Sequence, residues 1–373
     1  MPAQFYTYLV YLFYTVSGIQ FFFLIIIFGR LLFFNKQKVN SENIKKGLSI
    51  IITARNEYYN LKKFLPNILE QDYPEYEVIV VNDASTDDTD FILQELKSKY
   101  PHLNYFTVQS GINFFHGKKF PLSVGIKSAK YETILLTDAD CAPSSDQWAK
   151  EMVSAYEDNI EIVLGYGAYE EQRGFLNKLI RYDTIRVAIT YLSFAKWGMP
   201  YMGVGRNLSY KKDLFFKQNG FLSHYRIASG DDDLFINKAA NRKNTRIALS
   251  PNSKTISIPE KSFKDWFNQK RRHFSTGKNY KIWHLVLLGL WESSSFLFLI
   301  TLFLIIYNKL ILLQSLVIIG LWIITKLIVT KKFMILQEEN KLLLLSPLLE
   351  TIIVTLGVII NLSNMLLKQR KWK

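Results

Sequence analysis

Two carboxylates stand two residues apart at Asp138 and Asp140, directly after the apolar run 132–137. Alternate side chains that leave the end of a strand can converge on one hard cation, and Mg²⁺ and Mn²⁺ favour such oxygen ligands. An Asp-x-Asp pair is common by chance, but this one directly follows an apolar strand. That position makes it a much stronger indication of a metal site than the motif alone. The pattern predicts a divalent metal site at this strand end.

Three consecutive acidic residues, Asp231 to Asp233, follow Ser229 and Gly230. Their charges repel one another, so the arrangement costs stability unless cations or hydrogen-bond donors offset it. One interpretation is a solvated acidic loop. The other is catalytic, because a carboxylate here could accept a proton from an acceptor hydroxyl, as general-base catalysis requires.

Polar residues also end two earlier strands. The segment Thr53–Glu57 ends one apolar run and opens a helix, and Val81–Asp87 ends the next run. Asn56, Asp83 or Ser85 could simply satisfy free backbone amides as helix caps. Two such polar strand ends, side by side in a parallel sheet, nevertheless predict a nucleoside-binding site.

The segment 263–274 has helical amphipathicity. Its basic residues largely avoid the aromatic face, which comprises Phe263, Trp266, Phe267 and Phe274. A helix of this kind can lie in the headgroup plane of a bilayer, so one interpretation is membrane anchoring. The sharper interpretation is that Arg271 or Arg272 neutralises a departing diphosphate, because guanidinium stays charged and binds phosphate bidentately.

The elements that must position these residues alternate between strand and helix. Runs rich in β-formers lie at 48–53, 77–82, 103–108 and 132–137, and helical stretches lie between them at 57–71, 87–99 and 118–130. This alternation is typical of βαβ units with a mostly parallel sheet, in which ligands bind at the carboxyl ends of the strands. The sequence therefore predicts a Rossmann-like α/β domain whose acidic residues cluster at one edge.

The chain has 373 residues and a formal net charge of +14. The positive charge favours an anionic partner such as a membrane surface or a phosphorylated substrate. The basic residues are not gathered into the aromatic-interleaved patch of a nucleic-acid binder, so we expect no nucleic-acid partner. Cys141 is the only cysteine, which excludes an intramolecular disulfide and favours a reducing compartment.

Apolar segments at both ends of the chain predict membrane spans. The stretch Phe5–Phe34 carries no charge before Arg30 and is long enough to cross a hydrocarbon core of about 30 Å. Further spans are predicted at 284–307, 309–330 and 343–367. Basic residues follow the first span directly, namely Arg30, Lys36, Lys38, Lys45 and Lys46. By the positive-inside rule we expect an integral protein of the cell (inner) membrane with its middle region in the cytoplasm.

Four spans raise one difficulty, because they place the basic tail Lys368–Lys371 outside, against the same rule. Either one stretch is re-entrant or interfacial, or the rule fails locally. Glu292 and Glu350 are also polar groups at membrane depth. Such groups usually face protein or a water-filled path, whereas a Glu near the end of a span can reach the headgroups. The sequence leaves both interpretations open.

Taken in order, the four polar segments resemble the family 2 glycosyltransferases with a GT-A catalytic domain. The resemblance is to the membrane-bound branch that includes cellulose, hyaluronan and poly-N-acetylglucosamine synthases and ceramide glucosyltransferases, and it covers about residues 47–283. It implies an inverting transfer of a sugar from a nucleotide-sugar donor, expected to be a UDP-sugar, to a polysaccharide or lipid acceptor. The implied regions are an anchor with its basic flank at 1–46, a GT-A domain at 47–260, an amphipathic interface helix at 261–283 and a C-terminal membrane region at 284–373.

The same resemblance implies roles for individual residues. The residues implied for the nucleotide are Thr53, Ala54, Glu57, Asp83, Lys118 (with Gly117 before it) and Asp138. Those implied for the metal ion are Asp138 and Asp140, and the implied catalytic base is Asp232 with Asp231 beside it. Those implied for the diphosphate or acceptor are Gln269, Arg271, Arg272 and His273. The implied cofactor is a divalent metal ion, Mg²⁺ or Mn²⁺.

Two departures from the family pattern matter. Position 273 is His where the synthases have Trp. Asp233 adds a third acidic residue, so more than one aspartate of this segment can be aligned with the catalytic base of the family. Both weaken any inference of processivity, so the acceptor stays open between a polymer and a lipid. The alternative from another class is a non-catalytic membrane scaffold, or a transporter with a nucleotide-binding domain. A transporter normally carries its charged groups within the spans, whereas here they lie in the middle region.

Overall fold

The computed structural model describes residues 2–34, 46–109, 111, 117–227, 229–339 and 341–366. The chain forms two compact units. Among the described residues, the sheet unit comprises those of 46–172 and 198–261, and the helical unit comprises those of 2–34, 173–197 and 262–366. Segment 173–197, which the sequence analysis included in the 47–260 domain, thus groups by packing with the helices of the two chain ends.

A seven-stranded sheet with the order β3-β2-β1-β4-β8-β6-β9 forms the centre of the sheet unit. Its strands are β1 (Leu48–Ala54), β2 (Tyr76–Asp83), β3 (Leu103–Val108), β4 (Thr133–Asp138), β6 (Ile162–Leu164), β8 (Leu208–Lys211) and β9 (Thr245–Ile247). β1 pairs in parallel with β2 and β4, and β2 with β3, whereas β8 runs antiparallel to β4 and β6. The mostly parallel α/β sheet that the sequence predicted is confirmed.

A smaller sheet with the order β5-β10-β7 lies in the same unit. Its strands are β5 (Cys141–Pro143), β7 (Gly167–Tyr169) and β10 (Thr255–Ser257). β10 pairs antiparallel with β5, which opposes Ser257 to Cys141. This pairing brings a hydroxyl to the segment that directly follows Asp138 and Asp140.

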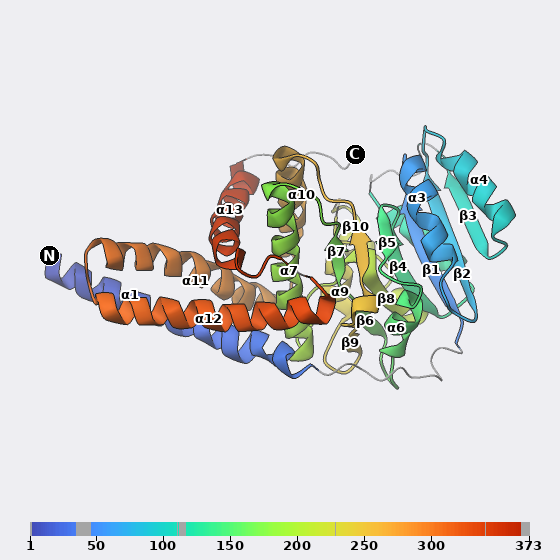
Figure 1. Cartoon of the computed structure of the whole chain (residues 1–373). Helices are drawn as coiled ribbons and strands as arrows, with labels where there is room; N and C mark the ends of the chain where they lie inside the picture. Colours follow the sequence, from blue (N-terminus) through green and yellow to red (C-terminus); the bar gives the residue numbers. More distant parts are fainter. Residues whose placement is uncertain are drawn as a thin grey trace. The chain divides into compact units, whose positions relative to one another are not determined.

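Helices follow the parallel strands where the sequence predicted them (Figure 1). The helices of the sheet unit are α3 (Tyr58–Leu69), α4 (Thr89–Lys99), α5 (Lys119–Ser128), α6 (Trp148–Ser154), α8 (Lys212–Lys217) and α9 (Asp233–Ala239). In α3 the buried Leu61, Leu65 and Ile68 recur at helical spacing and form one apolar face. α5 packs on β1 and β2, and a Cβ at its Gly125 would lie 2.5 Å from Ile51 Cγ2. Close packing of α5 therefore requires glycine at this position.

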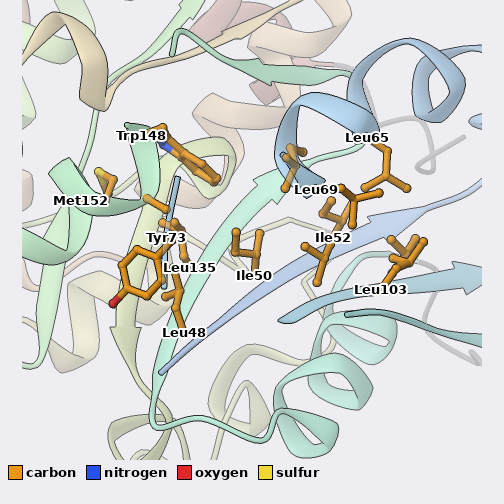
Figure 2. Packing of buried hydrophobic residues seen from close by; sticks show 14 of the residues in the cluster. Leu48, Ile50, Ile52, Leu65, Leu69, Tyr73, Leu103, Leu135, Trp148 and Met152 are labelled. Atoms are coloured by element: carbon orange, nitrogen blue, oxygen red, sulfur yellow. The ribbon is translucent and has the colours of Figure 1, made fainter. Parts of the chain in front are cut away.

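The hydrophobic core lies between the sheet and the helices α3, α4 and α6 (Figure 2). Ile50 and Ile52 of β1 are fully buried, as is Leu135 of β4. Leu65 of α3 and Trp148 of α6 pack into the same cluster. Burial of a large apolar side chain contributes about 1.5–3 kcal/mol, so this layer holds the strand ends rigidly.

The helical unit contains α1 (Pro2–Phe21), α7 (Phe175–Lys196), α10 (Phe263–Gly277), α11 (Ile282–Tyr307), α12 (Leu312–Gln337) and α13 (Ser346–Leu366). The helical stretch of α1 continues in π and 3₁₀ turns to Phe33. Within the described residues, four helices are long and apolar enough to cross a membrane, at 4–33, 282–307, 312–337 and 346–366. These agree with the four apolar stretches that the sequence analysis selected as spans.

Polar side chains join α1 to α11 and α12. The amide nitrogen of Gln20 donates to Ser294 Oγ at 2.8 Å and to Ser295 Oγ at 3.1 Å, and Trp322 Nε1 donates to Gln20 Oε1 at 3.3 Å. All four groups are buried. Hydrogen bonds between helices hold transmembrane assemblies together where the hydrophobic effect between helices is weak, so α1, α11 and α12 form one bundle.

Candidate active site

Three parallel strands end at the same edge of the sheet unit. Thr53 pairs in register with Asp138 of β4 and with Val81 of β2, and Asp83 ends β2 two residues later. Ala54 is the last residue of β1 and is buried. The structure therefore brings together the polar strand ends that the sequence placed side by side, at the edge where such sheets bind ligands.

Hydrogen bonds cross-link the loops that follow β1 and β2. The backbone nitrogen of Asn56 donates to Ser85 Oγ at 2.8 Å, and Asn56 Oδ1 accepts from the backbone nitrogen of Thr86 at 2.7 Å. Arg55 NH1 lies 4.0 Å from Oδ2 of the buried Asp83. Asn56 and Ser85 thus bond to each other's loops instead of capping separate helices, which fixes the two strand ends relative to one another.

Asp138 and Asp140 lie together with Cys141, and one ligand atom from each falls within 4.8 Å of the others. Asp140 Oδ2 accepts from Ser257 Oγ at 3.1 Å, and Oδ1 accepts from Cys141 Sγ at 3.4 Å. Burial raises the pKa of the Asp140 carboxyl, and the neighbouring Asp138 raises it further. Burial followed by the charge of Asp140 raises the pKa of Cys141 well above its usual value, so the thiol stays protonated. The hard donors of this cluster are therefore the two carboxylates.

Lys118 supplies the positive charge at this strand end. Its Nζ donates to Asp138 Oδ1 at 2.6 Å. Burial favours the neutral amine, but the carboxylates of Asp138 and then Asp231 outweigh it and raise the pKa of Lys118 above its usual value. The side chain is therefore a permanent cation that contacts Asp138 and interacts electrostatically with Asp231.

Glu57 shares this electrostatic environment. Burial raises its pKa, the hydrogen bond that Asn60 Nδ2 donates to Glu57 Oε2 at 2.6 Å opposes the rise, and the charge of Asp140 adds to it. The predicted nucleotide residue therefore lies near the predicted metal ligands in the folded chain.

The acidic segment begins α9, and its three carboxylates differ in their contacts. Asp232 is the N-cap: its Oδ1 accepts from the backbone nitrogen of Asp233 at 2.7 Å and its Oδ2 from the backbone nitrogen of Gly205 at 2.8 Å. Burial, then the charges of Asp231 and Asp233, raises the pKa of Asp232 to about 8. Asp233 is buried and bonds the backbone nitrogen of Leu234 at 2.7 Å. The solvated-loop interpretation therefore does not hold for Asp232 and Asp233.

Lys119 is a residue that the sequence analysis did not select. Its Nζ donates to the carbonyl oxygen of Ser229 at 2.6 Å and also to that of Ile227. Lys118 thus contacts the Asp-x-Asp segment while its neighbour Lys119 holds the loop that leads into Asp231. The consecutive lysines at the start of an apolar helix were the available signal, but their separate partners are set only by the fold.

Two protein-family models match the chain. Glycosyl transferase family 2 matches residues 49–216, and glycosyl transferase family group 2 matches residues 133–330, which is just over half of the chain. The chain belongs to the family 2 glycosyltransferases. The recognition made from the four polar segments is thereby confirmed.

Curated relatives of this family 2 glycosyltransferase include poly-beta-1,6-N-acetyl-D-glucosamine synthases. One from Staphylococcus epidermidis is 34% identical over 122 residues, which is 31% of this chain and 28% of the relative. One from Staphylococcus aureus (strain COL) is 27% identical over 111 residues, covering 30% of this chain and 26% of the relative. The matches thus span less than a third of these relatives' length.

The fold of this family 2 glycosyltransferase is similar to that of the mannosyltransferase PcManGT from Pyrobaculum calidifontis, which was solved in complex with GDP-Man and Mn²⁺. The TM-score is 0.62 at 16% sequence identity, and the similarity covers 96% of this chain and 99% of that chain. It extends through both units of the chain and supports the GT-A fold class.

The remaining predicted residues of this family 2 glycosyltransferase lie on α10, in the helical unit. They are Gln269, Arg271, Arg272 and His273. Arg271 Nε donates to Asn364 Oδ1 at 3.1 Å, so its guanidinium contacts α13. Of the aromatic face, only Trp266 is fully buried, while Phe263 is exposed. Contact of these four residues with a diphosphate or an acceptor stays a prediction.

Proposed function

We propose that this family 2 glycosyltransferase is an inverting enzyme that transfers a sugar from a nucleotide-sugar donor to a polysaccharide or lipid acceptor, with a uridine diphosphate sugar as the expected donor. The observation that carries the proposal is the Lys118–Asp138 pair, at 2.6 Å, where β1, β2 and β4 end. Asp231 acts on the same lysine. A cation for an anionic donor, carboxylates for a metal ion and an acidic segment for a base thus share one site.

In this proposal the nucleoside lies against the ends of β1 and β2. Thr53, Ala54 and Asp83 line that edge, and Glu57 opens the helix that follows β1. The cross-linked loops support this assignment because a rigid pair of strand ends needs little ordering when it binds a ligand. Lys118, whose ammonium group donates to Asp138, would contact the donor diphosphate.

The acidic segment supplies the base. Asp232 is favoured because two backbone amides orient its carboxylate and its pKa of about 8 lies near the pH at which a general base works best. Asp231 is the second candidate because it acts electrostatically on Lys118. Asp233 accepts a hydrogen bond from the backbone nitrogen of Leu234, so its carboxylate stabilises the start of α9.

The reaction is a single displacement. The acceptor hydroxyl oxygen bonds to the anomeric carbon of the donor, its proton passes to the base, and the bond from that carbon to the phosphate oxygen breaks with its electron pair. The nucleoside diphosphate leaves as an anion, and an α-linked donor gives a β-linked product. Lys118 stabilises the charge that develops on the departing oxygen, and preorganised charge of this kind is often the largest catalytic contribution.

Asp138 and Asp140 would hold a divalent metal ion, Mg²⁺ or Mn²⁺. The residues fit such an ion because both are carboxylates, Ser257 orients Asp140, and the protonated thiol of Cys141 offers no competing thiolate. When bound, the ion would neutralise negative charge on the diphosphate. Lys118 pairs with Asp138 beside this position.

The membrane forms part of the proposal. The basic flank after the first apolar stretch supports a cytoplasmic catalytic domain in a protein of the cell (inner) membrane. The amphipathic α10, with Gln269, Arg272 and His273, would meet the diphosphate or the acceptor at the bilayer surface. The resemblance to the family motif supports this role.

The test is a panel of UDP- and GDP-sugars offered to purified protein with membranes as the acceptor source. We expect transfer from one donor, with metal-dependent release of the nucleoside diphosphate. Product analysis then separates an organic-extractable glycolipid from a high-mass polymer. Lack of transfer and of nucleoside diphosphate release with every donor and metal would favour the scaffold or transporter alternative.

A further inference from the structure

Ion pairs hold the start of α13 against α7. Glu350 Oε1 lies 3.1 Å from Nε of Arg186, and Tyr182, on the same helix, donates to Glu350 Oε2 at 3.0 Å. Glu350 also pairs with Lys326 of α12. Its side chain is only 2% exposed, so Glu350 faces protein and not the headgroups.

A second set of bonds holds the end of α13 against α10. Arg271 Nε donates to Asn364 Oδ1 at 3.1 Å, and Asn364 Nδ2 donates to the carbonyl oxygen of Arg271 at 2.9 Å. Glu350 and Asn364 lie fourteen residues apart in one helix, which is about 21 Å at 1.5 Å per residue. A helix tied to one side of the membrane at both points cannot reach the other side between them.

Neither partner helix can cross a bilayer. The charged residues of α7 are Lys178, Arg181, Asp183, Arg186 and Lys196, and those of α10 are Lys264, Asp265, Lys270, Arg271 and Arg272. Five charges in one helix are too many for a span, since each costs about 2.5–3.5 kcal/mol at the bilayer centre. Both ends of α7 join the sheet unit in the chain, and α10 follows that unit directly. A salt bridge of 2.7 Å between Lys270 and Asp183 also joins α10 to α7.

We propose that the chain crosses the bilayer three times, with α1, α11 and α12, and that α13 lies with α7 and α10 in the membrane interface on the side of the sheet unit. Within the helical unit, α1, α11 and α12 run alongside one another, whereas α7, α10 and α13 run across them (Figure 1). The partner of this layer is a lipid surface. Apolar side chains of α13 remain exposed to it, namely Leu348, Ile359, Leu362, Met365 and Leu366.

An ion cluster of Arg186, Glu292, Lys326 and Glu350 marks the boundary of the hydrocarbon core. Arg186 NH2 lies 2.7 Å from Glu292 of α11, and Lys326 of α12 completes the cluster through Glu350. Beyond it, residues 293–308 and 310–325 carry no charge. Sixteen residues span about 24 Å, close to the thickness of a hydrocarbon core. Only Glu292 of the cluster's acids is half exposed, as suits a residue at that boundary.

Three spans also remove the conflict over charge. The turn between α11 and α12 carries Lys309 alone, while the basic flank after α1 and the basic tail from Lys368 onward fall on one side. That distribution obeys the positive-inside rule, which four spans would break. Anionic lipids attract such clusters, which suits an interfacial layer that ends in a basic tail.

Single cysteines test the topology without any need for activity. Cys141 is fully buried, so the unaltered chain is the control for background labelling. Lys309→Cys reports on the α11–α12 turn, Ser98→Cys on the exposed surface of the sheet unit and Lys371→Cys on the tail. Cells are treated with a membrane-impermeant maleimide before and after permeabilisation. We expect Lys309→Cys to be labelled in intact cells, and the other two to lose all label unless the cells are permeabilised.

The grouping of the three sites decides the result. If Lys371→Cys is labelled together with Lys309→Cys, α13 crosses the membrane and the proposal is overturned. If Ser98→Cys and Lys371→Cys are labelled together in intact cells, three spans hold and only the proposed cytoplasmic orientation of the catalytic domain fails. Fusions of green fluorescent protein and of alkaline phosphatase to the tail repeat the measurement. We expect the first fusion to fluoresce and the second to be inactive.

Discussion

Nζ of Lys118 lies 2.6 Å from Oδ1 of Asp138, and this pair joins the start of α5 to the end of β4. Asp231 adds to the charge that keeps the lysine protonated, so Lys118 interacts electrostatically with two acidic segments that are nearly a hundred residues apart in the chain. In the proposed function, Lys118 exchanges Asp138 for the diphosphate when an anionic donor binds.

Replacement of Lys118 by Met should lower kcat by about 10²- to 10³-fold, because one preorganised charge at the departing oxygen is removed. Lys118→Arg should retain part of the rate, since the positive charge persists. Lys62→Met, on the exposed face of α3, is the matched control. Steady-state kinetics with varied donor measure the effect. A Lys118→Met enzyme within about threefold of wild type would exclude this role.

Asp231→Asn and Asp232→Asn separate the two candidate bases. Loss of the general base should cost about 10²- to 10⁴-fold in kcat, and substitution of its neighbour considerably less. We expect the larger loss for Asp232→Asn, with Asp158→Asn on the exposed surface as the control. Donor binding by calorimetry checks that each variant still forms the site. If Asp232→Asn keeps activity within about tenfold of wild type, the base is not Asp232.

The pKa of about 8 at Asp232 also predicts a pH dependence. The base is active when deprotonated, so kcat/KM should rise with pH and level off above about pH 8. The same pKa lies above the ordinary value of about 3.9, so the folded state binds the proton more tightly than the unfolded state. Its contribution to stability is complete at low pH and is lost as the pH rises through about 8. Thermal unfolding of wild type and Asp232→Asn between pH 5 and 9 should show a pH dependence that the variant lacks.

Removal of metal by a chelator should abolish transfer, and Mg²⁺ or Mn²⁺ should restore it. Ser257→Ala removes the hydroxyl that orients Asp140 at 3.1 Å, and loss of such a supporting bond typically weakens metal affinity about 10- to 100-fold. The metal concentration for half-maximal activity should rise accordingly, with little change in activity at saturating metal. Ser98→Ala, on the exposed side of α4, is the control. An unchanged metal requirement in Ser257→Ala would place the ion elsewhere.

Glu350 and Glu292 bind the same arginine but differ in burial. Glu350→Gln leaves Arg186 and Lys326 without their buried counter-ion, which should lower stability by about 3–5 kcal/mol. Glu292→Gln should cost less than about 1 kcal/mol, because the side chain of Glu292 is 47% exposed. Thermal unfolding of the detergent-purified chain measures both. Equal losses in the two variants would contradict the burial of Glu350 in the ion cluster.

The strands and helices up to β4 were predictable because each has a strong local pattern. Ile50 and Ile52 alternate with residues on the other face of β1, and Leu61, Leu65 and Ile68 repeat at helical spacing. Short strands such as β8 were not predicted, since four residues carry too little periodicity. Lys119 and Ser257 were missed in the site for a related reason: each acts through a partner more than a hundred residues away.

The sequence by itself determined the chemistry that the chain can offer: Asp138 and Asp140 after an apolar strand, an acidic triplet, and apolar segments at both ends. Residue type and local periodicity suffice for these, because they depend on neighbours along the chain. Only the tertiary structure decided that Lys118 contacts Asp138, that Asp232 caps α9, and that α13 is tied to α7 and α10. These contacts depend on which charged groups are desolvated next to one another. That is determined only when segments far apart in the sequence pack together.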